Sequence, residues 1–319
     1  MNTKETNLNQ PAPENQPAQP EKQPAQPEKQ PEKQPVSVKW DLAYNKLVQD
    51  ITEKGQSKFV NGNGTISLIH QQIQVDLSDG SFPLLTTRKV NFRQVVDELL
   101  WDISGSHSIN EAGSASVFWK HLADADGNLP SVYGRFLTRF PRYNDNDKDT
   151  GEQIESSLKG EINQLGWIIN ELIDNPFSRR LVASLWHPAN ATVSKQPPCH
   201  VSLIFNVTGD VKQLSLNLLV TQRSADVALG LVIDVPKWSL LVILLASYLN
   251  MSPGLVTFTI ADAHIYEEHV EKLSEQIKRE PTGSPYVRFD TMTLCDYTAA
   301  DIELIGYQPH PAIRYSLVS

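Results

Sequence analysis

The chain has 319 residues, of which 40% are hydrophobic, and its formal net charge at pH 7 is −9. A chain of this length and composition can bury a large hydrophobic core. The acidic balance argues against binding to a nucleic-acid backbone, and no cluster of lysines and arginines offsets it. Binding of a free nucleotide stays open, because a few arginines suffice for one phosphate group.

The first 36 residues differ in composition from the rest of the chain. The heptapeptide QPAQPEK occurs at 16–22 and again at 23–29, and no aromatic residue precedes Trp40. Such a segment has too little apolar surface to form a core, so we predict a disordered or polyproline-like tail over 1–36. A docking arm is the alternative interpretation. Residues 37–319 are then the folded part.

The cysteine content and the apolar segments indicate the compartment. Cys199 and Cys295 are the two cysteines of the chain, too few for a disulfide framework. The start, MNTKETNLNQ, has no apolar signal-peptide region, and the longest apolar stretch, at 238–249, is too short to span a bilayer. These features predict a cytoplasmic protein that does not insert into a membrane.

The pattern of apolar residues predicts a mixture of helices and strands. Apolar side chains at helical spacing predict helices, in chain order, at 39–54, 92–104, 161–173 and 269–279, the last of them exposed. Alternating apolar and polar residues predict strands at 62–77, 201–207, 213–221 and 255–266, with a hairpin turn at 208–210. The polar residues 141–153 predict a mobile surface loop. Because strands and helices do not alternate strictly, we expect an α+β fold with one large sheet.

One acidic residue lies in the most apolar part of the chain. The segment LGLVIDVPKW at 229–238 places Asp234 two residues before Pro236 and ahead of a long apolar run. Aspartate is a favoured N-cap and proline suits the first helical turn, so one interpretation is a buried helix that begins at Asp234. The other interpretation is that the Asp234 carboxyl group contacts a ligand.

Cys199 lies in the segment QPPCHVSLIF, after two prolines and at the start of a strand. A cysteine in the body of a strand would usually be a core residue. Here the two prolines and the neighbouring His200 favour an exposed thiol, whose pKa nearby cationic groups would lower. From these residues alone, a nucleophile and a core cysteine are equally supported.

Three arginines and a histidine–tyrosine pair are candidate ligand contacts. SRR at 178–180 and QRSAD at 222–226 supply guanidinium groups that suit phosphate oxygens, although surface solvation is the usual role of an arginine. ADAHIY at 261–266 places His264 and Tyr266 on one face of a strand, where they could bind a sugar hydroxyl. A structural role is the alternative for both residues.

Eight motifs occur along the chain in a recognisable order: FPLLTTRKV (82–90), DELLW (97–101), LPSVYG (129–134), SRR, PPCH, QRSAD followed by LG, DAHIY and GYQPHP (306–311). In this order, from about residue 40 to the C-terminus, the sequence resembles the thymidylate synthase superfamily. The resemblance implies a single catalytic domain over 37–319, with a large mixed sheet flanked by helices and a homodimer formed through the sheet. It also implies a pyrimidine nucleoside monophosphate substrate, 5,10-methylenetetrahydrofolate as co-substrate and no metal.

The resemblance further implies roles for individual residues. Cys199 would attack C6 of the pyrimidine, Glu98 would organise proton transfer through water, and Tyr133 would lie beside the nucleophile together with His200. Arg179 and Arg180 would reach the phosphate of the partner subunit across the dimer interface. The other matched residues would bind the nucleotide (Gln222, Arg223, Ser224, His264 and Tyr266) or the folate (Asp226 and Trp119).

Two positions depart from the family pattern. Val60 precedes the glycine turn, where the family has an arginine that contacts phosphate, and Lys58 is a candidate to replace that contact. Leu122 stands where a second tryptophan is common, although Trp119 is present. The residues around the pterin ring of the folate are therefore expected to differ from those of the family.

Asp234 stands where thymidylate synthases usually have an asparagine that pairs with uracil. Cytosine presents the reverse edge, with N3 as an acceptor and the 4-amino group as a donor. A protonated carboxyl group can donate to N3 and accept from the amino group. Capping does not explain the change, because Asn caps a helix about as well as Asp. Within the superfamily, this replacement resembles the deoxycytidylate hydroxymethylases.

The sequence therefore predicts an enzyme that transfers a one-carbon unit to C5 of dCMP and adds water, which gives 5-hydroxymethyl-dCMP. Four alternatives remain open: a methyltransferase acting on dCMP or CMP, a CMP hydroxymethylase, a thymidylate synthase acting on dUMP, and a non-catalytic nucleotide-binding protein.

Deletion of residues 1–35 should leave the stability and the turnover of the protein nearly unchanged, because the repeat has no apolar residues able to join a core. Thermal unfolding of the full-length and the truncated protein checks this. A fall of several degrees in the midpoint on truncation would show that the tail packs on the folded part.

Overall fold

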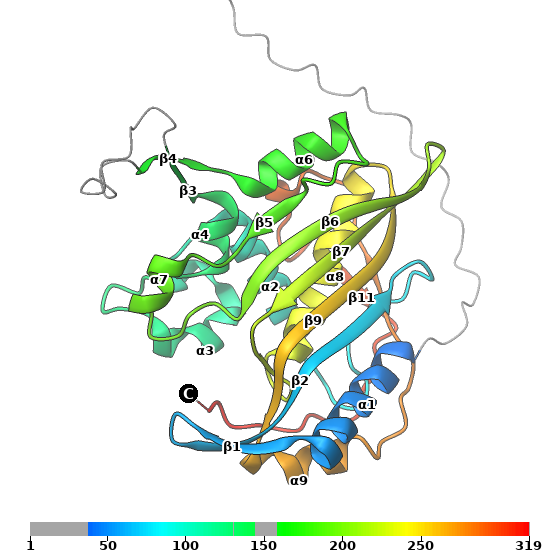
Figure 1. The fold of residues 1–319 in the computed structure, drawn as a ribbon. Coiled ribbons are helices and arrows are strands. Elements are labelled where there is room, and N and C mark those ends of the chain that lie inside the picture. The colour runs from blue at the N-terminus through cyan, green and yellow to red at the C-terminus, as the bar shows by residue number, and fades with distance from the viewer. Residues whose placement is uncertain (1–37, 130, 144–157, 319) are drawn as a thin grey trace, which may run out of the picture. The chain divides into compact units, whose positions relative to one another are not determined.

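The computed structural model describes residues 38–129, 131–143 and 158–318 (Figure 1). The tail predicted over 1–36 lies outside these residues. Of the polar segment predicted as a loop at 141–153, residues 144–153 also lie outside them, and residues 141–143 belong to a strand.

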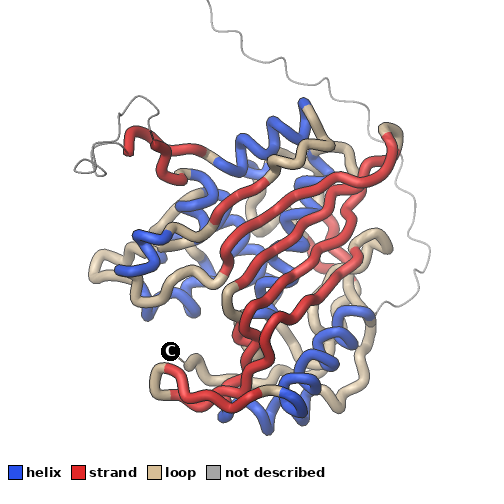
Figure 2. Tube along the Cα trace, in the orientation of Figure 1, coloured by secondary structure: helices blue, strands red, loops and turns tan. Residues whose placement is uncertain are grey.

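One seven-stranded mixed sheet organises the fold (Figure 2). Its order is β1-β2-β9-β7-β6-β5, and β8 pairs with β9. Neighbouring strands are antiparallel, except that β7 and β8 each run parallel to β9. The strands of this sheet are β1 (Gln56–Val60), β2 (Asn63–Asp76), β5 (Val182–Ser184), β6 (His200–Asp210), β7 (Gln213–Gln222), β8 (Ala225–Asp226) and β9 (Ser252–Tyr266). Two further antiparallel pairs join β3 (Phe140–Tyr143) to β4 (Leu158–Ile162) and β10 (Tyr286–Arg288) to β11 (Glu303–Ile305).

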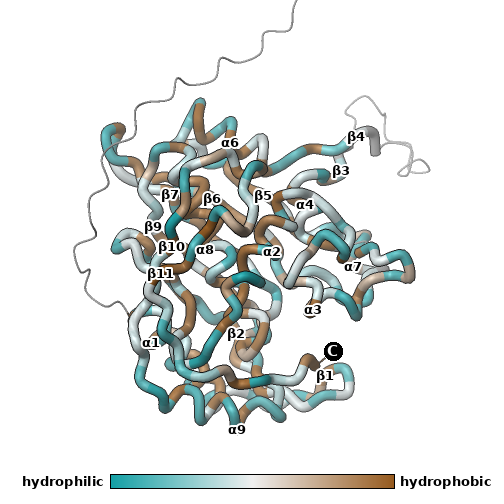
Figure 3. Tube along the Cα trace, turned by 180° about the vertical axis from the view of Figure 1, so that it is seen from behind, coloured by the Kyte–Doolittle hydropathy of each residue, from teal (hydrophilic) through white to brown (hydrophobic). Residues whose placement is uncertain are grey.

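The helices lie around this sheet, and α2 and α8 cover one of its faces (Figure 1, and from behind in Figure 3). The α-helices of the described residues are α1 (Lys39–Lys54), α2 (Phe92–Ser104), α3 (Ser116–Trp119), α4 (Tyr133–Thr138), α6 (Gln164–Asp174), α7 (Pro188–Val193), α8 (Leu231–Tyr248) and α9 (Glu267–Gln276). The prediction of an α+β fold with one large mixed sheet flanked by helices is confirmed, and the predicted ranges of α1 and α2 agree with the structure residue for residue.

The strands alternate between a buried face and a partly exposed face. On β6 and β7, Leu203, Phe205 and Leu218 are at most 2% exposed and point into the core. Their neighbours Ile204 and Leu219 pair with each other across the strands and are only half-buried. In Figure 1 this second face is turned toward the viewer, and no described helix crosses it there.

Helix α8 is the core element of the fold. It is apolar almost all round, as expected for a helix with no face to solvent, and packs against α2, β7 and β9. Its length of 18 residues and its hydropathy alone would allow it to span a membrane, but 78% of it is buried inside the protein. The predicted stretch comprised only residues 238–249, which are too few to span a bilayer. The helix begins seven residues earlier, at Leu231, and is long enough, but most of it is buried in the protein core.

The early start of α8 removes the capping interpretation of Asp234. The N-cap of α8 is Gly230, and Asp234 lies in the first turn, with its backbone N–H donating to the carbonyl of Gly230 at 2.9 Å. Pro236 lies inside the helix rather than in its first turn. The apolar residues 231–233 continue the helix in the N-terminal direction, so the Asp–Pro signal marks no helix start here.

Two other boundaries differ from the sequence prediction. The helix expected at 161–173 begins at Gln164, because residues 158–162 pair with β3 and Asn163 caps the helix by accepting from the N–H of Gly166 at 2.8 Å. The hairpin expected at 208–210 turns at residues 211–212, since Asp210 still pairs with Gln213. Helix α9, expected to be exposed, buries Leu273 and two polar residues.

Candidate active site

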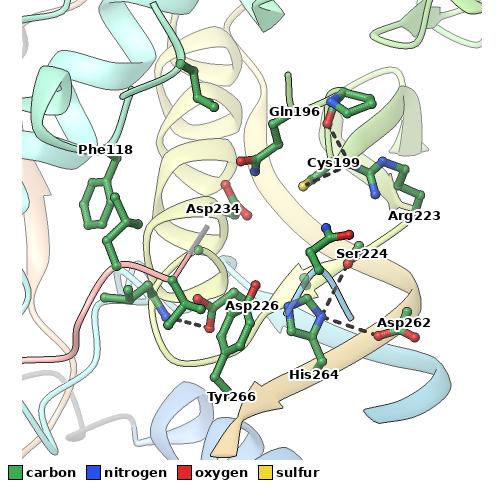
Figure 4. A pocket seen from close by; sticks show the side chains of 18 of the residues that line it. Phe118, Gln196, Cys199, Arg223, Ser224, Asp226, Asp234, Asp262, His264 and Tyr266 are labelled. Atoms are coloured by element: carbon green, nitrogen blue, oxygen red, sulfur yellow. Dashed lines mark hydrogen bonds and ion pairs between the residues drawn. The ribbon is translucent and has the colours of Figure 1, made fainter. Parts of the chain in front are cut away.

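A cavity of about 850 Å³ opens beside the first turn of α8 (Figure 4). It brings together residues that lie far apart in the sequence, from β1 near residue 60 to the C-terminal residues 317–318. The predicted site residues that line it are Glu98, Trp119, Tyr133, Cys199, Arg223, Ser224, Asp226, Asp234, His264 and Tyr266. The two positions that depart from the family pattern, Val60 and Leu122, line it as well.

Cys199 lies directly before β6, and its thiol is held beside a guanidinium group. Arg223 donates to the carbonyl oxygens of Pro198 at 2.9 Å and Pro197 at 2.7 Å, and its Nη2 lies 3.9 Å from the sulfur. The backbone N–H of Cys199 donates to the Tyr133 hydroxyl at 3.1 Å. The two prolines therefore supply carbonyls that fix the arginine next to the nucleophile.

The charge state of the thiol differs from the sequence expectation. Burial raises the pKa of the Cys199 thiol above its ordinary value, and the opposing effect of the Arg223 charge is smaller. The cation therefore lowers the pKa of the thiol, as the sequence indicated, but burial outweighs this effect and the net shift is upward. The sequence could place a cation near the sulfur, but it could not weigh that charge against burial.

Asp234 reaches the cavity from α8 and is fixed from behind by a polar network. Nε2 of Gln222 donates to Oδ2 of Asp234 at 2.8 Å and lies 3.0 Å from Nε2 of His200. Nε1 of Trp238 donates to the same His200 nitrogen at 3.1 Å. Gln222 and His200 are buried and are not among the residues lining the cavity, and both contact the Asp234 carboxyl group.

The surroundings of Asp234 favour its protonated form. Burial raises the pKa of Asp234 to about 7, and the charge of Lys237 opposes that rise. Burial also lowers the pKa of His200 well below its ordinary value, so this imidazole is neutral. Oδ1 of Asp234 lies 3.5 Å from the His200 nitrogen that accepts from Trp238, and an ionised oxygen would face that lone pair. Protonation of Asp234 removes the negative charge of the carboxylate and so weakens this repulsion.

Glu98 is held by a buried ion-pair cluster that sequence reasoning missed. Nζ of Lys237 lies 2.8 Å from Oε1 of Glu98 and 3.1 Å from Oδ2 of Asp102, and the Lys237 side chain has no exposed surface. Burial alone would lower the pKa of Lys237, yet Asp102 and Glu98 raise it above its ordinary value, so the ammonium is charged. A lysine within an apolar helix was the available signal, because such a residue requires a buried counter-ion.

The far end of the cavity carries a polar chain on β9 and its neighbours. The Ser224 hydroxyl lies 3.4 Å from Nδ1 of His264, which lies 3.4 Å from a carboxylate oxygen of Asp262. Lys58 pairs with the same carboxylate at 2.7 Å. The lysine considered as a replacement for the missing phosphate contact is therefore engaged by Asp262.

The side of the cavity expected to bind the folate is mostly apolar. Trp119 stacks edge to face on Tyr133, with 5.6 Å between the ring centroids, and the side chains of Leu229 and Ile233 complete this wall. Asp226 accepts from the backbone N–H groups of Ala228 and Leu229. Its carboxylate therefore also holds the turn that leads into α8.

Arg179 and Arg180 lie before β5, are exposed and do not line this cavity. Over residues 38–129, 131–143 and 158–318, no three His, Cys, Asp or Glu side chains are grouped so that they could hold a metal ion.

The fold is one domain with a large mixed sheet flanked by helices, and its cavity is lined by both polar and apolar side chains. The sequence model of the thymidylate synthase family matches residues 42–319, so the chain belongs to this family. The family transfers a one-carbon unit from 5,10-methylenetetrahydrofolate to a pyrimidine nucleoside monophosphate, and the protein is a folate-dependent one-carbon transferase.

The raised pKa of Asp234 predicts a pH-dependent stability difference between the wild type and Asp234→Asn. An unfolded aspartate releases its proton near its ordinary pKa of 3.8, whereas the native one holds it up to about pH 7. Between these values the unfolded state has the lower proton affinity, so wild-type stability falls as the pH rises. The wild type should lose on the order of 4 kcal/mol relative to Asp234→Asn from pH 4 to pH 8. Urea unfolding of both proteins at several pH values measures this, and a constant difference would contradict it.

Proposed function

We propose that the protein is a deoxycytidylate 5-hydroxymethyltransferase. The observation that carries this proposal is a buried carboxyl group, Asp234, on the cavity wall, whose pKa burial raises to about 7. The resemblance to thymidylate synthases places it where the uracil-binding relatives usually have an asparagine. The overall reaction would be dCMP, 5,10-methylenetetrahydrofolate and water giving 5-hydroxymethyl-dCMP and tetrahydrofolate.

The contacts of Asp234 match the edge of cytosine. Since Oδ2 accepts from Gln222, the proton resides on Oδ1, which can donate it to N3 of the base. Oδ2 has a second lone pair that can accept from the 4-amino group. Uracil has a proton on N3, so it would leave the Oδ1–H group without an acceptor, and a buried unpaired group is costly.

The same proton would assist the attack by Cys199. Negative charge builds on N3 as the sulfur bonds to C6, and a donor already in place there lowers the barrier. Attack requires the thiolate, and Arg223 at 3.9 Å is the cation nearest to the sulfur. Glu98, on the cavity wall, would then order the water that removes the C5 proton.

The fate of the transferred carbon decides between the products. Once the bond between the folate and the transferred carbon has broken, an exocyclic methylene remains at C5. Water addition to it gives a hydroxymethyl group and leaves tetrahydrofolate, whereas hydride transfer from tetrahydrofolate gives a methyl group and dihydrofolate. Leu122 lines the cavity where the relatives commonly have a tryptophan. The smaller side chain favours access of water to C5. A volume of about 850 Å³ lies near the upper end of the range for small-molecule sites, which leaves room for nucleotide, pterin and water.

The deciding assay incubates the protein with the folate and with dCMP, CMP or dUMP, and identifies products by mass. We expect a gain of one CH2O unit on dCMP. A methylated product, CMP as the better substrate, or turnover of dUMP alone would each replace the proposal by that alternative. Nucleotide binding without any product would indicate a non-catalytic protein.

We also propose that the active protein is a homodimer formed through the sheet. The face without helices carries a row of cross-strand neighbours, Val182, Ile204, Leu219 and Thr257, which are exposed or half-buried in a single chain. Apolar residues on an open sheet face are typical of an interface. The exposed Arg179 and Arg180 adjoin this face and would reach the phosphate in the partner's cavity.

Asp234→Asn should shift the preference of the enzyme from dCMP toward dUMP. The amide has no acidic proton for N3 of cytosine, and it offers uracil a donor and an acceptor. Sites built on such pairing discriminate by roughly 10⁴ or more, so kcat/KM for dCMP should fall steeply while turnover of dUMP appears. An unchanged ratio of kcat/KM for the two nucleotides would remove Asp234 from substrate selection.

Mixing Arg179→Ala/Arg180→Ala chains with Cys199→Ser chains should partly restore activity. Each variant alone lacks either the phosphate arginines or the nucleophile. In a hybrid dimer that shares arginines, one of the two sites has both. Activity of purified heterodimers measures this, and absence of recovery would show that the arginines serve their own subunit or only the fold.

A further inference from the structure

The buried lysine behind the cavity is not used by the chemistry described so far. Lys237 is the third residue after Asp234 on α8, and its side chain has no exposed surface. Its Nζ lies between Glu98 and Asp102, which are four residues apart on one face of α2. The ammonium also lies 4.9 Å from the ring centroid of Tyr133 and 4.7 Å from that of Trp238. Lys237 thus contacts one residue of the cavity wall, Glu98, directly, and packs on another, Tyr133.

A charge in such a position is expensive to bury, which makes a passive role costly. Apolar side chains of similar volume often stabilise a core as well as a buried ion pair does, or better. Stability alone therefore does not explain the buried ammonium, and its effect on the neighbouring residues has to be considered. It contacts Oε1 of Glu98, and since the Glu98 side chain lines the cavity, Oε2 is the oxygen left for a ligand or a water.

We infer that Lys237 is a positioning residue of the active site, whose ammonium orders the Glu98 carboxylate against the cavity and sets the charge that surrounds Asp234. The part that concerns Glu98 as an organiser of proton transfer rests on the proposed function. The part that concerns the charge around Asp234 does not.

A charge count shows why the cluster acts on Asp234. One ammonium already faces two carboxyl groups, so a third carboxylate at Asp234 would lack a cation of its own. Lys237 opposes the rise in the pKa of Asp234, whereas Glu98 and Asp102 add to it. The groups that surround Asp234 are Lys237 on its own helix, Glu98 and Asp102 on α2, the neutral His200 and the amide of Gln222 on the strands, and Cys199 and Tyr133 beside the cavity.

Lys237→Met alone would leave two buried carboxyl groups without their cation, and such a protein can fail to fold. The informative variant is therefore Lys237→Met/Asp102→Leu, which replaces the ammonium and one carboxylate together by apolar side chains. Asp102→Asn removes one carboxylate and keeps the ammonium. Ser239→Ala, at a fully buried residue of the same helix outside the cavity, is the matched control for a substitution in this part of the core.

Two readouts test the inference. The first is the midpoint of the Asp234 titration, followed by the infrared carboxyl band that disappears in Asp234→Asn. The double variant keeps the net charge of the cluster, but Lys237 acts on Asp234 more strongly than Asp102 does. The midpoint should therefore rise by about one pH unit in the double variant, a tenfold change in the protonation equilibrium, and fall in Asp102→Asn. The second is turnover of the nucleotide: the folded double variant should lose roughly 100-fold or more in kcat with KM changed less than about threefold. Ser239→Ala should match the wild type in both.

Either readout left at its wild-type value in the folded double variant overturns the inference, because a lysine that only fills the core moves neither. The infrared titration needs no substrate. A wild type that turns over none of the nucleotides therefore defeats the proposed function, while the titration alone still decides whether Lys237 sets the charge around Asp234.

Discussion

The constraint on which this structure depends is the burial of charge in an apolar helix. Helix α8 fills the centre of the molecule, and its first two turns carry both a carboxyl group and an ammonium. The ammonium is satisfied by two carboxyl groups of α2, so the ion-pair cluster fixes how α2 and α8 pack. The carboxyl group of Asp234 forms no ion pair with that ammonium, and burial raises its pKa to about 7.

The first turn of α8 and the ends of two strands of the sheet together form part of the wall of the cavity. On the cavity side, Asp234 is fixed by Gln222 at the end of β7, and that amide also lies against His200 at the start of β6. The nucleophile precedes β6 by one residue, so the sheet register sets the distance between the thiol and the carboxyl group. Arg223 follows Gln222 directly and holds the carbonyls of Pro197 and Pro198. The proposed base-recognition residue and the proposed nucleophile are thus positioned by the same pair of strands.

The sequence predicted the elements whose signals are local. The ranges of α1 and α2 and the strands β2, β6, β7 and β9 follow from apolar periodicity. Ten of the predicted site residues line one cavity, and eight of these ten lie in the ordered motifs. The start of α8 was wrong, because an Asp–Pro pair is a typical N-terminal signal even where apolar residues extend the helix upstream. The pairing of Lys237 with Asp102 and the raised pKa of the Cys199 thiol could not be read from the sequence, because both depend on which distant residues share one buried volume.

The choice between an amide and a carboxyl group at residue 234 is therefore a property of the whole cluster. A carboxyl group recognises the cytosine edge only while it holds a proton, and an exposed aspartate would have lost it well below neutral pH. Burial supplies most of the required shift in pKa, and the neighbouring carboxylates add to it. Lys237 limits that shift, so Asp234 stays able to release its proton near neutral pH. The proposed donation of a proton to N3 during the attack requires this. An aspartate introduced at this position in a relative without this balance of charges would either lose its proton below neutral pH or fail to release it near neutral pH.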